Sequence, residues 1–196
     1  MGTATPAAVI REAPARTFVH VSRLPGTPVA ARQAASRAAR NGEIVSIRPG
    51  LYYRGAMTRY GMTRPRVEEV ATEVFGDEGA GPAGYSAARE WGVTSQIPAT
   101  FHVATLTKVA TIEGITQHQR RNRKRSRLNP KEIALLELMR APSVYVESGW
   151  ESLVSIVEKA LSATVIRLES LREAAVAEPR SVRENFERVL HDLGSE

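Results

Sequence analysis

The stretch that decides the fold is residues 27–54, TPVAARQAASRAARNGEIVSIRPGLYYR. Its first half begins with Thr27 and Pro28, a threonine that can cap free backbone N–H groups followed by a proline suited to the first helical turn. Asn41 and Gly42 form a typical helix stop, since glycine readily adopts the left-handed conformation that ends helices. The sequence therefore predicts a helix from Thr27 to Asn41.

One face of this helix is suited to DNA. Arginine and glutamine reach base edges in the major groove through paired hydrogen bonds, and serine reaches a base or a phosphate. The outward positions at helical spacing are Arg32, Gln33, Ser36, Arg37 and Arg40. The opposite side carries small residues that allow close packing, namely Ala31, Ala35 and Ala38. The alternative is a solvated face in an arginine-rich protein.

The second half of the stretch predicts a β-hairpin. Two β-rich runs, 43–47 and 51–54, flank a turn that contains Arg48. A helix followed directly by a hairpin with a basic tip is typical of a winged helix-turn-helix, whose wing lies along the DNA backbone or minor groove. Arg48, Tyr52 and Arg54 are the candidate contacts in the hairpin. Tyr52 and Tyr53 point to opposite faces, and alternation alone leaves open which one closes the core.

Outward from this stretch, the pattern predicts an α+β protein with two domains. Residues 1–60 would form the winged helix-turn-helix domain, and residues 61–196 a mixed α/β domain with a helical C-terminal end. Residues 55–64 are expected to be a linker or crossover. The further helices expected are 5–12, 67–75, 85–91, 130–140, 148–161, 163–176 and 181–193, and the further strands are 101–107, 109–115 and 144–146.

The composition excludes several classes of protein. The chain has 196 residues, of which 42% are apolar and 24% charged, so it can form a packed core. No apolar run approaches the ~18–20 residues that a membrane-spanning helix needs, and no secretory signal is evident. The absence of cysteine excludes disulfides and thiolate metal sites. We expect a cytoplasmic, nucleoid-associated protein without a membrane partner.

Charge is segregated along the chain. Residues 1–60 contain nine arginines, no lysine and only two acidic residues, whereas residues 132–196 are net acidic. Arginine offers a planar fork that matches phosphates and guanine edges, which favours nucleic acid as a partner. A genome rich in G and C is the alternative explanation of the arginine bias.

A second basic block lies at residues 117–131, which hold seven bases and no acid. Such a run is expected to stay extended unless a polyanion neutralises it, and a flexible solvated loop is the alternative. As a functional site it would hold phosphates with little sequence preference. This secondary basic patch comprises Arg120, Arg121, Arg123, Lys124, Arg125 and Arg127.

The sequence does not predict an enzyme. The four histidines are isolated and lack the spacing of a zinc site, and no glycine-rich phosphate loop is present. We therefore expect no catalytic residue, no metal and no cofactor. The rival is a metal-dependent nuclease that uses acidic residues such as Glu69 and Asp77, which are more typical of a solvated helix face.

Two motifs resemble those of AbiEi-type antitoxins, the DNA-binding members of bacterial type IV toxin–antitoxin pairs. The stretch GEIVSIRPGLYYR (42–54) is similar to the family's wing motif. The stretch GYSAAREWGVTSQIP (84–98) is similar to its Ser-Ala-Ala…Gln-x-Pro signature, with Val-Thr in place of the usual Leu-Ser. The resemblance covers most of residues 17–142.

The resemblance implies a repressor that binds double-stranded operator DNA of its own operon and counteracts a nucleotidyltransferase-like toxin. We expect a monomer in solution, with two copies on an inverted repeat. Two alternatives remain open at this point. One is an orphan regulator without a toxin, and the other is an antitoxin that acts mainly by binding the toxin directly.

Overall fold

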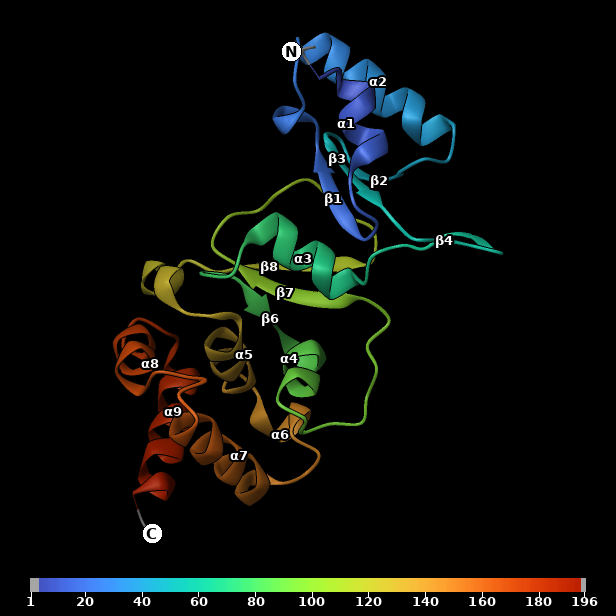
Figure 1. Cartoon of the computed structure of the whole chain (residues 1–196). Coiled ribbons are helices and arrows are strands. Elements are labelled where there is room, and N and C mark those ends of the chain that lie inside the picture. The colour runs from blue at the N-terminus through green and yellow to red at the C-terminus, as the bar shows by residue number, and fades with distance from the viewer. Residues whose placement is uncertain (1–3, 195–196) are drawn as a thin grey trace. The chain divides into compact units, whose positions relative to one another are not determined.

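The computed structural model describes residues 4–194 and divides the chain into two compact units, Met1–Glu73 and Val74–Glu196 (Figure 1). The fold is mixed α+β. The division falls inside helix α3 (Val67–Phe75), later than the boundary expected after residue 60. One reason is the contact between His20 Nε2 and Glu73 Oε1, at 2.5 Å, which ties α3 to the first unit.

The first unit combines two helices with a small sheet. In chain order its elements are α1 (Pro6–Glu12), β1 (Thr17–His20), the 3-10 helix η1 (Val21–Arg23), α2 (Pro28–Arg40), β2 (Val45–Arg48), β3 (Leu51–Arg54), β4 (Met57–Thr58), β5 (Gly61–Met62) and α3. The helices and the β2–β3 hairpin expected from residues 5–54 are present within one or two residues of their predicted ends.

An antiparallel three-stranded sheet supports the helices of this unit. The strand order is β1-β3-β2, so the first strand pairs with the last strand of the hairpin. Small alanines on α2 allow it to approach α1 and the sheet closely. The buried cluster between them consists of Ile10, Val19, Ala34, Ala35, Ala38 and Ile44.

The expected linker at residues 55–64 is instead a second hairpin, formed by β4 and β5. Its base is closed by Thr63, whose N–H donates to Ala56 O and whose hydroxyl accepts from Ala56 N. Gly55 is required there because a Cβ would lie 2.0 Å from Thr63 O. The glycines that suggested a linker therefore permit a tight hairpin.

The second unit contains a small sheet and a group of helices. Its elements after α3 are β6 (Gly81–Pro82), α4 (Gly84–Glu90), β7 (Phe101–Thr105), β8 (Ile115–Gln119), the 3-10 helix η2 (Arg123–Arg127), α5 (Pro130–Leu138), α6 (Pro142–Tyr145), α7 (Trp150–Ser162), α8 (Leu168–Ala175) and α9 (Arg180–Leu193). β6 pairs antiparallel with β7, and β7 pairs parallel with β8.

Helix α5 lies at the centre of the second unit. It packs on α4, β6, α8 and α9, and every residue from Glu132 to Met139 is buried. A capping box starts it: the Asn129 side chain accepts from Glu132 N, and the Glu132 carboxylate accepts from Asn129 N. Gly81 allows the close approach of β6, since a Cβ there would lie 2.6 Å from Pro130 O.

Two expected strands are wrong. Residues 109–114 form a loop, because the side chain of Gln117 satisfies both the N–H and the carbonyl of Val109 in place of a strand partner. Residues 144–146 were expected to be extended, but Pro142 starts the short helix α6, which takes in Val144. Helix α8 also begins at Leu168 rather than at residue 163.

Candidate nucleic-acid interface

Helix α2 presents its predicted face to solvent. Thr27 caps the helix by accepting from Ala30 N at 3.2 Å, and Asn41 and Gly42, the latter with φ of 73°, end it. The alanines of the opposite face are buried. Arg32, Gln33, Ser36, Arg37 and Arg40 are all exposed.

These five residues line one shallow groove of about 390 Å³, which we call the α2 groove. Within residues 4–194, none of their side chains has a hydrogen-bond or ion-pair partner. The groove is therefore a cluster of free cationic and polar groups, with no carboxylate in its lining. Such a surface is suited to a polyanion.

The β2–β3 hairpin is short and held against its own unit. The carbonyl of Gly50 in its turn accepts from Val21 N at 3.0 Å, so the turn is attached to η1. Arg48 is only partly exposed, and its Nη1 is enclosed without a hydrogen-bond partner in the described part of the chain. Tyr53 is the buried tyrosine, edge-on to Phe18, whereas Tyr52 packs on the helical cluster and stays partly exposed.

Arg54, one of the predicted DNA contacts, also has a structural role in the first unit. Its Nη1 donates to Ile10 O at 2.6 Å and also to Arg11 O. These are carbonyls at the C-terminal end of α1, where helix carbonyls lack partners within the helix. The guanidinium therefore fastens α1 to β3. The sequence shows the positive charge of Arg54, but it does not show that this guanidinium lies beside the C-terminal end of α1.

The secondary basic patch also differs from its prediction. Residues 123–127 form the 3-10 helix η2 and are not extended, and Arg125 is 1% exposed. Arg120 is largely buried as well, with its backbone N–H bonded to Thr105 O. Two of the six predicted cations are thus paired with carboxylates of the protein itself, and of these Arg125 is enclosed in the interior.

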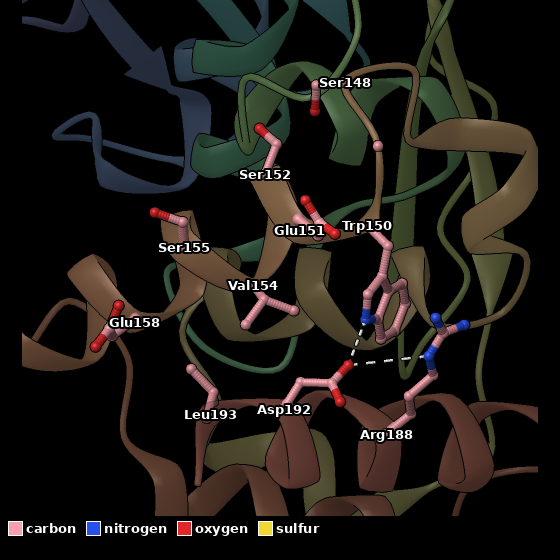
Figure 2. A pocket seen from close by; sticks show the side chains of 11 residues that line it. Ser148, Trp150, Glu151, Ser152, Val154, Ser155, Glu158, Arg188, Asp192 and Leu193 are labelled. Carbon is pink, nitrogen blue, oxygen red and sulfur yellow. Dashed lines mark hydrogen bonds and ion pairs between the residues drawn. The ribbon is translucent and has the colours of Figure 1, made fainter. Parts of the chain in front are cut away.

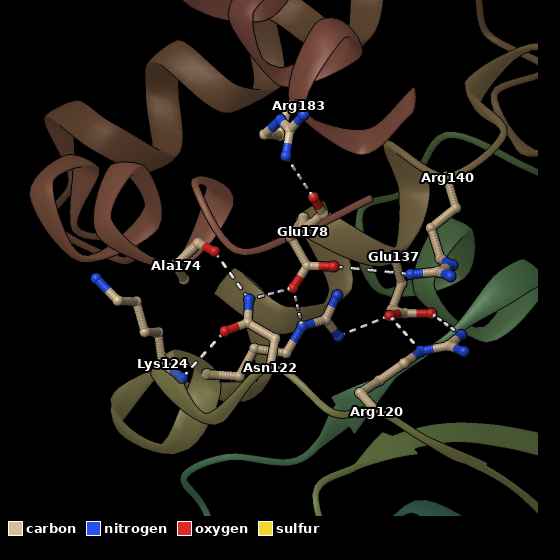
Figure 3. Close-up of polar contacts among 9 residues, drawn as sticks. Arg120, Asn122, Lys124, Glu137, Arg140, Ala174, Glu178 and Arg183 are labelled. Carbon is tan, nitrogen blue, oxygen red and sulfur yellow. Dashed lines mark hydrogen bonds and ion pairs between the residues drawn. The ribbon is translucent and has the colours of Figure 1, made fainter. Parts of the chain in front are cut away.

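Figure 3 shows the acidic partners of these two arginines, which lie on α5 and just after α8. Arg125 donates to Glu137 and to Glu178, at 2.6 Å in each case. Arg120 forms a two-pronged contact with Glu137 at 2.9 and 2.5 Å. We call this set of four side chains the buried ion network.

Charge pairing decides the ionisation of the network. Burial alone raises the pKa of Glu137, but hydrogen bonds from Arg120 and the charge of Arg125 outweigh it and hold that pKa below its usual value. Burial tends to lower the pKa of Arg125, and its bonds to Glu178 and Glu137 raise it overall. Both shifts favour the charged forms of Glu137 and Arg125.

The other four cations of the patch remain on the surface. Arg121, Arg123, Lys124 and Arg127 are exposed, and of these only Lys124 has an ion pair within the described residues, with Glu173 at 3.6 Å. Asn122, between them, is fixed by Nδ2 bonds to Ala174 O and Glu178. We call these four cations the basic edge, a set of charges on an ordered segment.

Residues 84–98, the second stretch compared with the antitoxin family, contribute to the packing of the second unit. Ala87 and Ala88 are fully buried, and the Ser86 hydroxyl accepts from His102 N at 2.9 Å. Gly92, with φ of 68°, ends α4. Farther on, Ser95 donates through its N–H and hydroxyl to Glu147, and Ile97 is left 80% exposed.

A larger groove of about 880 Å³ lies along α7 and α9 (Figure 2). Trp150 is fixed there, because its Nε1 donates to Asp192 at 2.6 Å and the guanidinium of Arg188 lies 4.3 Å from the ring centroid. Glu151 and Glu158 also line the groove. The groove is lined by three carboxylates and one arginine, so its net charge is negative. A negatively charged groove is better suited to a basic protein surface than to nucleic acid.

The histidines do not gather into a metal site. His102 Nδ1 and His118 Nε2 lie 2.9 Å apart and their rings are stacked. Burial, the charge of Arg120 and the neighbouring His102 lower the pKa of His118. Among residues 4–194 no group of three or more histidine, aspartate or glutamate side chains is placed to hold a metal ion.

No family model matches the chain, and no curated protein gives a significant match. Among solved structures, the RV2827C protein from Mycobacterium tuberculosis is similar in fold, with a TM-score of 0.52 at 14% sequence identity. The match covers 97% of this chain and 76% of that one. Within the described residues, no helix combines the length and hydropathy needed to cross a membrane.

Proposed function

We propose that this protein binds double-stranded DNA through its first unit and represses transcription. The α2 groove carries the proposal: five polar or cationic side chains, unpaired among the described residues, line one exposed helix face. Buried alanines behind them leave that face free of any packing role. In a winged helix-turn-helix, the corresponding helix enters the major groove.

The topology of the unit supports the winged-helix interpretation. The order α1, β1, η1, α2, β2, β3 places a helix pair ahead of a hairpin, and β1 pairs with β3 beside that hairpin. In this proposal Arg32, Gln33 and Arg37 contact base edges. Arg48 and Tyr52 lie nearer the backbone and contribute little to sequence preference.

We further propose that the repressor is an antitoxin of the AbiEi type, partnered by a nucleotidyltransferase-like toxin and without an enzymatic activity of its own. The wing-like and Ser-Ala-Ala motifs support this assignment. The acidic groove at Trp150 is the surface best suited to a basic face of such a protein. An antitoxin that acts mainly by direct binding would use that groove more than the α2 groove.

The DNA-binding proposal is tested by titrating two duplexes, one covering the sequence upstream of the protein's own gene and one of random sequence. Arg37→Ala should weaken binding to the upstream duplex by about 1–3 kcal/mol and reduce discrimination between the two. Arg48→Ala should weaken binding to both duplexes alike. Arg11→Ala, which removes an exposed charge from α1, is the matched control.

If Arg37→Ala and Arg48→Ala both bind like the wild-type protein, the docking of α2 is wrong. The antitoxin assignment is tested separately, by co-expression with the product of a neighbouring gene. Rescue of growth and co-purification that survive Arg37→Ala would favour direct toxin binding. If Trp150→Ala abolishes both growth rescue and co-purification, the toxin contacts the acidic groove.

A further inference from the structure

The β4–β5 hairpin is a well-ordered element that the proposed winged helix does not use. Thr58 supports its turn, since its hydroxyl donates to Gly61 O at 2.8 Å and accepts from Tyr60 N. Together with the bonds between Ala56 and Thr63, these contacts fix the hairpin at both ends. Its backbone is thus specified locally.

The hairpin contributes little to the core. Met57 is 69% exposed and Tyr60 is 84% exposed, although both side chains are large and mostly apolar. Figure 1 shows the hairpin extending away from the three-stranded sheet. A hairpin that is held rigid and yet leaves its apolar side chains in water is suited to contact a partner.

The chemistry of the segment favours a polyanion. Residues 44–67 contain five arginines and no acidic residue. At the tip, the guanidinium of Arg59 lies 4.6 Å from the ring centroid of Tyr60. An arginine beside an exposed aromatic ring can contact a phosphate and can also offer a flat apolar surface. Nucleic acid would use both features, whereas an acidic protein surface would use the charge alone and an apolar one the ring alone.

We propose that the β4–β5 hairpin is a second DNA-binding arm, which places Arg59 on a phosphate and Met57 and Tyr60 in an adjacent minor groove. This inference rests on the proposed DNA binding by α2. The β2–β3 turn is attached to η1, so the freely projecting loop of this unit is the later hairpin. Apolar side chains, methionine among them, are the ones that minor-groove proteins insert in this way.

The test uses the full-length protein and the same upstream and random duplexes. Tyr60→Ala should weaken binding to both about fivefold to tenfold, and hydroxyl-radical footprinting of the upstream duplex should lose the flanking protection beside each bound copy while the protection from α2 remains. Arg59→Ala should reduce the slope of log K against log salt concentration by about 0.9. Arg11→Ala is the charge-matched control and should leave the flank protected.

The outcomes separate this inference from the proposed function. If Arg37→Ala abolishes specific binding while Tyr60→Ala and Arg59→Ala keep wild-type affinity and footprint, the arm is wrong and DNA binding by α2 stands. If the hairpin variants lose a protein partner but not DNA, the arm is equally overturned. If the wild-type protein binds neither duplex, both proposals fail. Far-UV circular dichroism and thermal unfolding verify that each variant is folded.

Discussion

Arg125 and Glu137 form an ion pair of 2.6 Å in which both side chains are 1% exposed. A charge removed from water to this degree is costly unless it is paired and hydrogen-bonded. Glu178 supplies a second carboxylate to Arg125, and Arg120 supplies a second guanidinium to Glu137. Arg125 is therefore part of the interior of the second unit, although its neighbours in the basic edge are exposed.

Replacing Arg125 by methionine should lower the free energy of unfolding of the second unit by about 3–5 kcal/mol, because two buried carboxylates would lose their shared partner. The measurement is urea unfolding followed by tryptophan fluorescence. Trp91 and Trp150 are the two tryptophans of the chain, and both lie in the second unit.

Arg121→Met is the matched control, because the two arginines lie on the same segment and Arg121 is exposed without a partner in the described chain. It should change the unfolding free energy by no more than about 0.5 kcal/mol. Equal effects of the two substitutions would contradict the structural role of Arg125.

The network also predicts how stability depends on pH. The pKa of Glu137 is held below its ordinary value of 4.5 despite burial, by Arg120 and Arg125, and that of Glu132 is lowered against burial by Arg167 and Asn129. Their contribution to stability is complete above pH 4.5 and is lost as the pH falls through the lower folded-state pKa values.

Glu137→Gln should therefore destabilise the second unit near neutral pH and differ less from the wild-type protein as the pH falls toward about 3. Urea titrations at several pH values between neutrality and that limit measure this convergence. A difference that stayed constant over this range would show that Glu137 acts through packing rather than charge.

The elements of the first unit were largely predictable because their signals are local. Thr27 and Pro28 start α2, and Gly42 follows its end, as the cap and turn chemistry requires. Local signals were insufficient where a side chain replaced a backbone partner. The side chain of Gln117 hydrogen-bonds the backbone of Val109 across a loop. The alternation of residue types in residues 109–114 does not reveal that contact.

The exposed face of α2 was also predictable, because helical spacing separates alanine from polar residues there. The interior role of Arg120 and Arg125 was not, since their partners are 12 to 53 residues away in sequence. One signal was present in α5, where Glu132 and Glu137 interrupt a run that is otherwise apolar and fully buried. Buried carboxylates in such a helix require cationic partners. The basic block at residues 117–131, just before the helix in sequence, contains many cations.

Arg54→Ala should loosen the first unit more than it weakens DNA binding. The guanidinium accounts for two hydrogen bonds to the end of α1, so its loss should cost about 1–3 kcal/mol. Hydrogen exchange followed by mass spectrometry should show faster exchange in residues 6–13. Unchanged exchange together with a large loss of affinity would show that Arg54 acts mainly as a DNA contact.

The stacked pair of His102 and His118 predicts a second pH effect. The folded-state pKa of His118 is lowered by burial, Arg120 and His102, so the unfolded chain binds the proton more readily. Stability should rise with pH up to about 6.5 and then level off. His118→Asn should flatten this rise in urea titrations between about pH 5 and 7, and an unchanged slope would contradict it.

We expect the basic edge, unlike the buried arginines, to contribute to the salt dependence of DNA binding. Arg121, Arg123 and Arg127 are exposed cations on a segment fixed by Asn122, so a bound duplex would find them already ordered. Replacing all three by alanine should reduce the slope of log K against log salt concentration by about 0.9 for each phosphate that is no longer neutralised, with discrimination between the upstream and random duplexes unchanged. Titrations between about 50 and 200 mM salt measure both quantities. If the slope stays at its wild-type value, these charges are a solvated surface, and DNA binding is confined to the first unit.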